Sequence, residues 1–230
     1  MVTPILLILT LISGMWCDCL ALNLMGGRGR KPDVSLIRAK QSLLEKVSKC
    51  GANGNKANDS QRTEIAELVQ SLEKLSKTSQ TAKSKLLECS SWKLAYTDFD
   101  PPAPSSGRLG PFTGAVYQYL DPKGGQIKNL LKISLPGVAI YGGLVARASI
   151  VSKDTWKIDF DYVTNAADIF GFKLGGSRKY FDKEIRLWKM TYLDDELRIL
   201  RAKKEDSDDG ESFVFITVSV ADIPLPVKDI

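Results

Sequence analysis

The segment Thr191–Arg201 carries the side chains of this chain that are best suited to chemistry. Acids and arginines stand close together here between apolar residues, near the end of a run of predicted strands. A charge buried alone in a strand costs several kcal/mol, so these charges must pair internally or hold a ligand. Paired carboxylates can act as general acid and base, and Asp194, Asp195 and Glu196 are the candidates. Adjacent residues on a strand or turn diverge, however, and no second carboxylate motif is evident, so an enzyme is the less favoured interpretation.

Histidine is absent from the sequence. This removes Ser-His-Asp and Cys-His catalysis and histidine-ligated metals from consideration. Cys50 and Cys89 lie too far apart in the sequence for a compact zinc knuckle, and two thiolates cannot close such a site. We therefore expect no metal, no cofactor and two reduced, partly buried thiols, with a Cys50–Cys89 disulfide as the alternative.

Residues 1–21 are predicted to be a signal peptide. The apolar run Ile5–Ile12 is far shorter than the ~20 residues of a membrane span, and cleavage after Ala21 fits its small flanking residues. Residues 22–33 follow as a basic arm, free of acids from Leu22 to Lys31. This arm resembles a transit peptide, and the alternative is a disordered arm on a secreted protein.

Residues 34–90 are predicted to form a helical region with two amphipathic helices. The first runs from Pro32-Asp33 to Gly51, and Asp59 or Ser60 is expected to cap the second. The expected apolar faces are Leu36, Ile37, Leu43, Leu44 and Val47 in the first helix, and Ile65, Leu68, Val69, Leu72 and Leu75 in the second. We expect these faces to pack on the following domain, with a protein partner as the alternative.

Residues 91–222 are predicted to form a β-barrel, followed by a tail over residues 223–230. The period changes to two at Ser91. The predicted strands are Ser91–Thr97, Ala115–Leu120, Gln126–Ile133, Val138–Val151, Trp156–Tyr162, Glu184–Leu193, Leu197–Arg201 and Ser212–Val220. Short turns make them antiparallel, and a sheet of about eight strands tends to close around side chains or one small ligand. Asn165–Gly176 breaks the pattern and is predicted as a short helix or loop across the mouth.

The charge balance disfavours a nucleic-acid partner. The net charge is +5, and no dense basic stripe with interleaved aromatic residues is present. A weak attraction to anionic lipid surfaces is compatible with this charge.

Several sequence blocks together resemble a known family. They are Leu43-Leu44 with Arg62, Glu64, Ile65, Leu68, Val69 and Leu72-Glu73; Leu86-Leu87 with Trp92-Lys93-Leu94 and Tyr96-Thr97; Tyr117-Gln118-Tyr119 with Asn129; and Thr191–Asp194 with Leu197–Ile199, Arg201 and Phe213–Phe215. In order and spacing these blocks are similar to the plastid lipid-associated proteins, or fibrillins, over about Ser35–Ile216. The chain departs from the family at Ser91, where glycine is usual, and at Arg201-Ala202, where Arg-Gly and a tight turn are usual.

The resemblance implies an α+β, mainly β fold, in which N-terminal helices pack on a lipocalin-like antiparallel barrel. It implies a non-enzymatic protein that binds or organises prenylquinones, carotenoids or polar lipids and contacts a membrane or lipid-droplet surface. It also implies a plastid location, at thylakoids or plastoglobules, reached through a two-part leader, with secretion as the alternative. A scaffold that recruits a lipid or isoprenoid biosynthetic enzyme through its helices is the second functional hypothesis.

A lipid carrier of this kind needs an apolar lumen and a few polar groups for the ligand head. The candidates for those polar contacts are Tyr192, Asp194, Arg198 and Arg201. Alternate positions of a strand share a face, so Arg198 and Arg201 are expected on opposite faces and at most one reaches the lumen. The alternative for Asp194 and Arg198 is a structural clamp that closes the barrel.

Aromatic residues supply the remaining candidates. Trp156, Phe160 and Tyr162 alternate with charged residues and are expected to line the lumen or fill it. Trp92 is expected to plug one end of the barrel, and Tyr96 belongs to the same structural motif.

Overall fold

The computed structural model describes residues 34–76, 91–99, 104–121, 125–207, 212–221 and 223. The predicted leader, most of the predicted tail and Cys89 lie outside these residues. The described residues all belong to one compact unit, Val34–Ile230. Its elements are α1 (Val34–Ser48), η1 (Ala52–Gly54), α2 (Asp59–Leu75), β1 (Ser91–Thr97), η3 (Pro104–Ser106), β2 (Arg108–Leu109), β3 (Phe112–Thr113), β4 (Ala115–Asp121), β5 (Gln126–Leu135), β6 (Val138–Ile150), β7 (Thr155–Ile169), β8 (Phe172–Leu174), β9 (Arg178–Leu193), β10 (Leu197–Lys204) and β11 (Phe213–Ser219).

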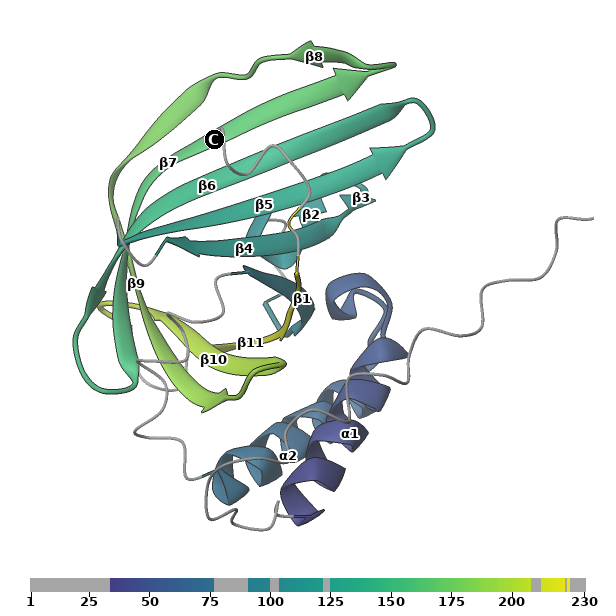
Figure 1. Cartoon of the computed structure of the whole chain (residues 1–230), viewed down its shortest axis with the longest axis vertical. Helices are drawn as coiled ribbons and strands as arrows, with labels where there is room; N and C mark the ends of the chain where they lie inside the picture. The colour runs from purple at the N-terminus through teal and green to yellow at the C-terminus, as the bar shows by residue number, and fades with distance from the viewer. Residues whose placement is uncertain are drawn as a thin grey trace, which may run out of the picture. The chain divides into compact units, whose positions relative to one another are not determined.

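Eight of the strands close into an antiparallel barrel (Figure 1). The main sheet has the order β6-β5-β4-β1-β11-β10-β9-β7-β8, and an additional pairing of β6 with β7 closes the ring. Each barrel strand pairs with the next one along the chain, and β1 pairs with β11. The predicted class, helices followed by a mainly β barrel, is confirmed.

The segment Asn165–Gly176 is a β-hairpin, so its prediction as a helix or loop is wrong. Strand β7 continues to Ile169, and β8 pairs back onto it. The turn residues Phe170 and Gly171 both have positive φ, at 49° and 87°. Two successive positive φ angles are typical of the tight turns whose twist matches that of a hairpin. The sequence pattern did not reveal this strand because β8 has only three residues, Phe172–Leu174.

The barrel is much longer on one side than on the other. Strands β6, β7 and β9 have 13, 15 and 16 residues, whereas β1, β4 and β11 have 7 each. The long strands therefore project beyond one end of the closed ring, as a flared sheet (Figure 1). At the opposite end the interior is filled by a cluster that includes Trp92, Trp156 and Trp188. Trp92 is fully buried in this cluster.

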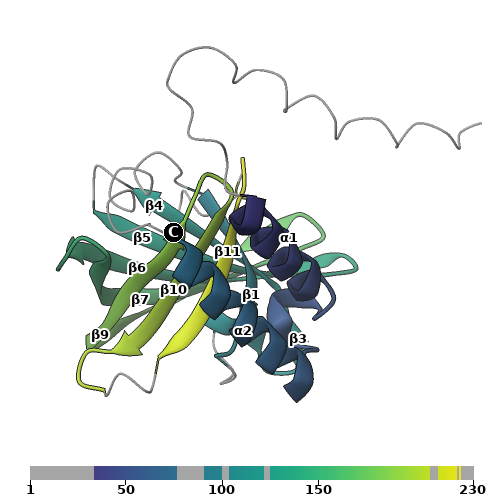
Figure 2. The same cartoon turned by 90° about the horizontal axis from the view of Figure 1, so that it is seen from below.

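Helices α1 and α2 pack on the outer face of β9, β10, β11 and β1 (Figure 2). The shared cluster contains Leu43, Val47, Cys50, Ile65, Val69, Leu72, Tyr96, Tyr192, Leu197, Ile199, Val214 and Ile216. Cys50 is a free, buried thiol. Ile37, predicted on the buried face of α1, is instead 43% exposed. None of the helices in the described part of the chain is long and apolar enough to cross a membrane.

Two local features differ from the sequence prediction. The N-cap of α2 is Asn58, not Asp59 or Ser60, because Asn58 and Gln61 exchange side-chain to backbone hydrogen bonds in a capping box. A register shift between Leu94 and Tyr96 interrupts β1. This irregularity turns Tyr96 to the helices while Leu94 stays on the cavity side.

Docking of the helices is tested by the paired leucines of α2. Leu72 is fully buried against the barrel and Leu75, one turn further on, is 38% exposed. We expect Leu72→Ala to lower the free energy of unfolding by about 2–5 kcal/mol, through lost burial and a cavity. Leu75→Ala is the matched control and is expected to cost less than about 1 kcal/mol. Urea denaturation measures both, and equal losses would contradict the docked arrangement.

Candidate functional site

The segment Thr191–Arg201 includes the start of strand β10, whose side chains lie in two different environments. Leu197 and Ile199 pack against the helices. Arg198 and Leu200 line a cavity inside the barrel, because successive side chains of a strand point to opposite faces. Arg201 lies on the helical face, so the two arginines point apart, as the spacing of three residues requires.

On the helical face, Asp194 is held by several donors. Its Oδ2 accepts hydrogen bonds from the hydroxyl of Tyr192 and from Nζ of Lys40, both at 2.7 Å. Its Oδ1 accepts from the backbone N–H groups of Glu196 and Leu197, at 2.9 and 2.7 Å. Asp194 thereby shapes the β9–β10 turn and ties it to α1.

The protonation states in this cluster are set by the same contacts. Burial is the largest influence on the pKa of Asp194 and acts to raise it, but the bonds from Lys40, Tyr192 and the backbone outweigh burial and lower that pKa. Burial, reinforced by the bond to Asp194, raises the pKa of Tyr192. At neutral pH the carboxylate is therefore ionised and the phenol protonated, which fixes each as acceptor and donor.

The remaining outward candidate, Arg201, joins the barrel to α2. Its Nε and Nη2 donate to the two carboxylate oxygens of Glu73, at 3.0 and 3.1 Å. Such a two-point contact fixes the orientation of the guanidinium. Tyr192, Asp194 and Arg201 thus all face the helices and hold the architecture in place.

Arg198 is the one candidate head-group contact that points into the barrel. It is fully buried. Its Nε donates to Oγ1 of Thr217 at 3.0 Å, its Nη2 donates to Oε1 of Gln118, and its guanidinium lies 4.7 Å from the centre of the Trp92 ring. Nε2 of Gln118 in turn donates to Oδ1 of Asn129 at 2.8 Å. Asp194 and Arg198 therefore belong to two separate networks instead of one clamp. The Asp194 network lies on the helical face of the sheet, and the Arg198 network lies on the cavity face.

The cavity beside Arg198 measures about 680 Å³, within the usual range for small-molecule sites. Polar groups are gathered around Arg198, Gln118, Asn129 and Thr217. The rest of the wall is largely apolar and includes Leu94, Phe99, Val116, Leu144, Phe160, Val163, Phe181, Trp188, Leu200, Ala202, Phe213 and Phe215. This arrangement suits a ligand with a long apolar body and one polar end.

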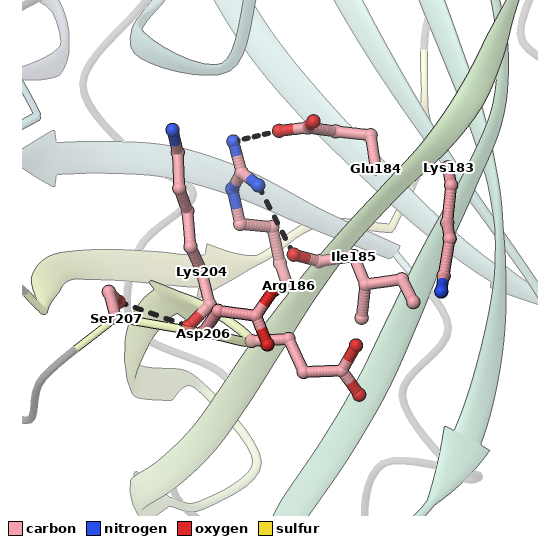
Figure 3. A pocket seen from close by; sticks show the side chains of 8 residues that line it. Lys183, Glu184, Ile185, Arg186, Lys204, Asp206 and Ser207 are labelled. Carbon is pink, nitrogen blue, oxygen red and sulfur yellow. Dashed lines mark hydrogen bonds and ion pairs between the residues drawn. The ribbon is translucent and has the colours of Figure 1, made fainter.

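The rim of the cavity is charged. Arg186 forms an ion pair with Glu184 and donates to the carbonyl oxygen of Ile185 at 3.2 Å (Figure 3). Glu184, Arg186, Lys204 and Ser207 also line an adjoining pocket of about 530 Å³. Cations outnumber acids in the cavity lining, where Arg186, Arg198, Lys203 and Lys204 face Glu184.

The three aromatic candidates of β7 have different surroundings. Phe160 lines the cavity, and Trp156 is buried in the cluster that fills the closed end. A register shift lies between Phe160 and Tyr162, and beyond it Val163 rather than Tyr162 lines the cavity. Tyr162 packs instead against Tyr180, at 5.5 Å between ring centres, and beneath the guanidinium of Arg178. A bulge of this kind exchanges the faces of all later residues.

Sequence reasoning missed the polar partners of Arg198. Gln118 lies 80 residues before Arg198 in the chain, and Thr217 lies 19 residues after it. Gln118 and Asn129 do stand in the third block of the family resemblance, and their cross-strand pairing on β4 and β5 was the available signal. No spacing rule, however, connects that hairpin to β10 before the barrel is closed.

The carboxylate enzyme hypothesis finds no support in this geometry. The Asp194 carboxylate is occupied by Lys40, Tyr192 and the backbone, and Glu196, 76% exposed at its side chain, pairs with Lys40 at 2.7 Å. Within the described ranges, no group of three or more histidine, cysteine or acidic side chains is placed to hold a metal ion.

The cluster on the helical face predicts an acid dependence of stability. The pKa of Asp194 is lower in the folded chain than the ordinary 3.8, so its stabilisation is present above that value and is lost as the pH falls through the folded pKa. We expect Asp194→Asn to lower the free energy of unfolding at pH 7 by about 1–3 kcal/mol and to flatten its decline below about pH 4. Exposed Asp206→Asn is the control. Parallel acid profiles for wild type and Asp194→Asn would contradict the assignment.

The comparisons with known proteins give one family match. No curated protein matches the chain. The family model PAP_fibrillin matches residues 37–173, which extend from α1 through β8. The match covers more than half of the chain, and the chain therefore belongs to the PAP_fibrillin family.

Proposed function

We propose that this protein binds one lipid-like amphiphile inside its barrel, with the apolar body against the aromatic and aliphatic wall and the polar end near Arg198. The observation that supports this most directly is the fully buried Arg198 beside an apolar cavity of about 680 Å³. Burial of apolar surface supplies most of the affinity, at about 25 cal/mol per Å². The guanidinium supplies orientation, because it donates to ligand oxygens.

The chemical class of the ligand follows from the polar groups around Arg198 and from the apolar wall of the cavity. Prenylquinones and polar lipids carry acceptor oxygens that suit Arg198, whereas a hydrocarbon carotenoid gains nothing from that side chain. Along β10, Arg198 lies about 20 Å from Lys204 at about 3.3 Å per residue, so a single chain can extend from the inner cation to the rim.

Family membership supports the same proposal. PAP_fibrillin proteins are plastid lipid-associated proteins, and this chain belongs to that family. We propose that it acts as a binding protein rather than as an enzyme. We further propose a thylakoid or plastoglobule location reached through the two-part leader. The scaffold hypothesis is less well supported, since most apolar side chains of α1 and α2 pack in the cluster that they share with the barrel.

The first test is native purification of the full chain from its own cells, followed by solvent extraction and mass spectrometry. We expect one prenylquinone or polar lipid near one molecule per protein. Leu200→Trp fills the cavity and should abolish this copurification, whereas Val218→Trp, on the opposite face of the sheet, is the control. A broad mixture of membrane lipids, equal in both variants, would contradict a cavity ligand.

The role of Arg198 is tested with two fluorescent probes. We expect Arg198→Met to weaken binding of cis-parinaric acid about tenfold, from loss of a charge-assisted hydrogen bond, and to leave binding of the head-less probe diphenylhexatriene unchanged. Arg201→Met, on the helical face, is the matched control. Equal weakening of both probes would mean that the variant disturbs the cavity itself and that Arg198 does not recognise a head group.

A further inference from the structure

Two hairpin turns meet at the flared end of the barrel. The β7–β8 turn at Phe170 and the β5–β6 turn at Gly137 are joined by a hydrogen bond from the Phe170 N–H to the Gly137 carbonyl oxygen, at 2.8 Å. Asp168 Oδ1 accepts from the backbone N–H of Gly171, also at 2.8 Å, and so braces the turn. Figure 1 shows both turns at the projecting ends of the long strands. We call these two turns with β8 the hairpin tips.

The hairpin tips expose large apolar side chains. Phe170 and Phe172 are 78% and 76% exposed. The neighbouring apolar residues that are also exposed are Leu135, Ile169 and Leu174. A concentrated apolar patch of this kind marks an interaction surface, since isolated exposed residues need no such explanation.

Charge near the hairpin tips indicates which partner fits them. Arg178 and Lys179 follow the turn closely in the chain, and both are exposed. The nearest acid, Asp168, is engaged by the turn itself. Aromatic residues beside cations are the combination that binds the interface of an anionic lipid layer.

The hairpin tips also lie at the end of the barrel where the cavity opens. Val163 on β7 and Phe181 on β9 line the cavity. Ile169 stands about 20 Å further along β7, at about 3.3 Å per residue. The exposed pair Ile150 and Val151, by contrast, lies where β6 ends and the β6–β7 turn begins, and Ile150 pairs with Trp156 of the buried tryptophan cluster.

We propose that the hairpin tips insert into the surface of an anionic lipid layer and hold the open end of the barrel against it. This proposal rests on the proposed function in one respect: a cavity that binds lipid would exchange its ligand with the layer through the open end of the barrel. Insertion itself requires no cavity ligand. Phe170 and Phe172 enter the acyl boundary, and Lys179 faces the head groups.

The test is flotation of the full chain with vesicles of phosphatidylcholine alone or with 30% phosphatidylglycerol. Phe170→Ser with Phe172→Ser should reduce vesicle binding about tenfold or more, by removing the inserted rings. Lys179→Gln should reduce it about fivefold, and only on the anionic vesicles. The matched control, Ile150→Ser with Val151→Ser, removes two exposed apolar residues from the opposite end and should bind as wild type does. Thermal melting of each variant checks the fold.

A second measurement reports directly how deeply the β7–β8 turn enters the lipid layer. Phe170→Trp should show a blue-shifted emission on vesicles and quenching by brominated acyl chains. Unchanged vesicle binding of the double serine variant, or absence of quenching, would overturn the proposal. A third outcome would also overturn it. If wild type self-associates but does not bind vesicles, and the double serine variant no longer self-associates, the patch joins two copies of this chain.

Different results would contradict the cavity ligand and the insertion of the hairpin tips. If the hairpin tips insert but the cavity holds no ligand, vesicle binding depends on Phe170 and Phe172 while cis-parinaric acid does not bind. If the cavity binds ligand but the hairpin tips do not insert, Leu200→Trp abolishes probe binding while the double serine variant floats as wild type does.

Discussion

Strand β10 is buried on both of its faces, and the rest of the structure depends on how its side chains divide between them. Leu197 and Ile199 belong to the cluster with the helices, whereas Arg198 and Leu200 face the cavity. A strand enclosed in this way can carry charge only where partners meet each charge. The helices supply those partners outside, through Lys40 and Glu73, and the barrel wall supplies them inside.

This division explains why the acids and arginines of one short segment have unrelated roles. The outward groups fasten two helices to the barrel, because their hydrogen bonds span α1, α2 and the β9–β10 turn. The fastening in turn keeps one wall of the cavity in a fixed position. Arg198 is then presented from a supported strand, against the ring of Trp92 and the amide of Gln118.

The interior of the barrel combines several kinds of surroundings. Tryptophans belong to its buried cluster, Arg198 and its neutral partners share the cavity with a largely apolar wall, and further cations line the same cavity. Beyond the rim, the long strands carry exposed phenylalanines outward. Each region alone is compatible with several functions. Together they suit the proposed amphiphile, with its polar end near Arg198 and its chain along the apolar wall.

The sequence by itself determined the two helices, the eight barrel strands and the opposite directions of Arg198 and Arg201, because these follow from periodicity within one element. The number of strands and their short turns predicted the closed antiparallel barrel. It also contained the blocks that mark the family. Only the tertiary structure decided that Tyr96 and Tyr162 leave the faces predicted for them, since each follows a bulge and one irregular residue exchanges the faces beyond it. Closure of the ring decided that Gln118 meets Arg198 across 80 residues, because such a contact depends on strand order and not on spacing.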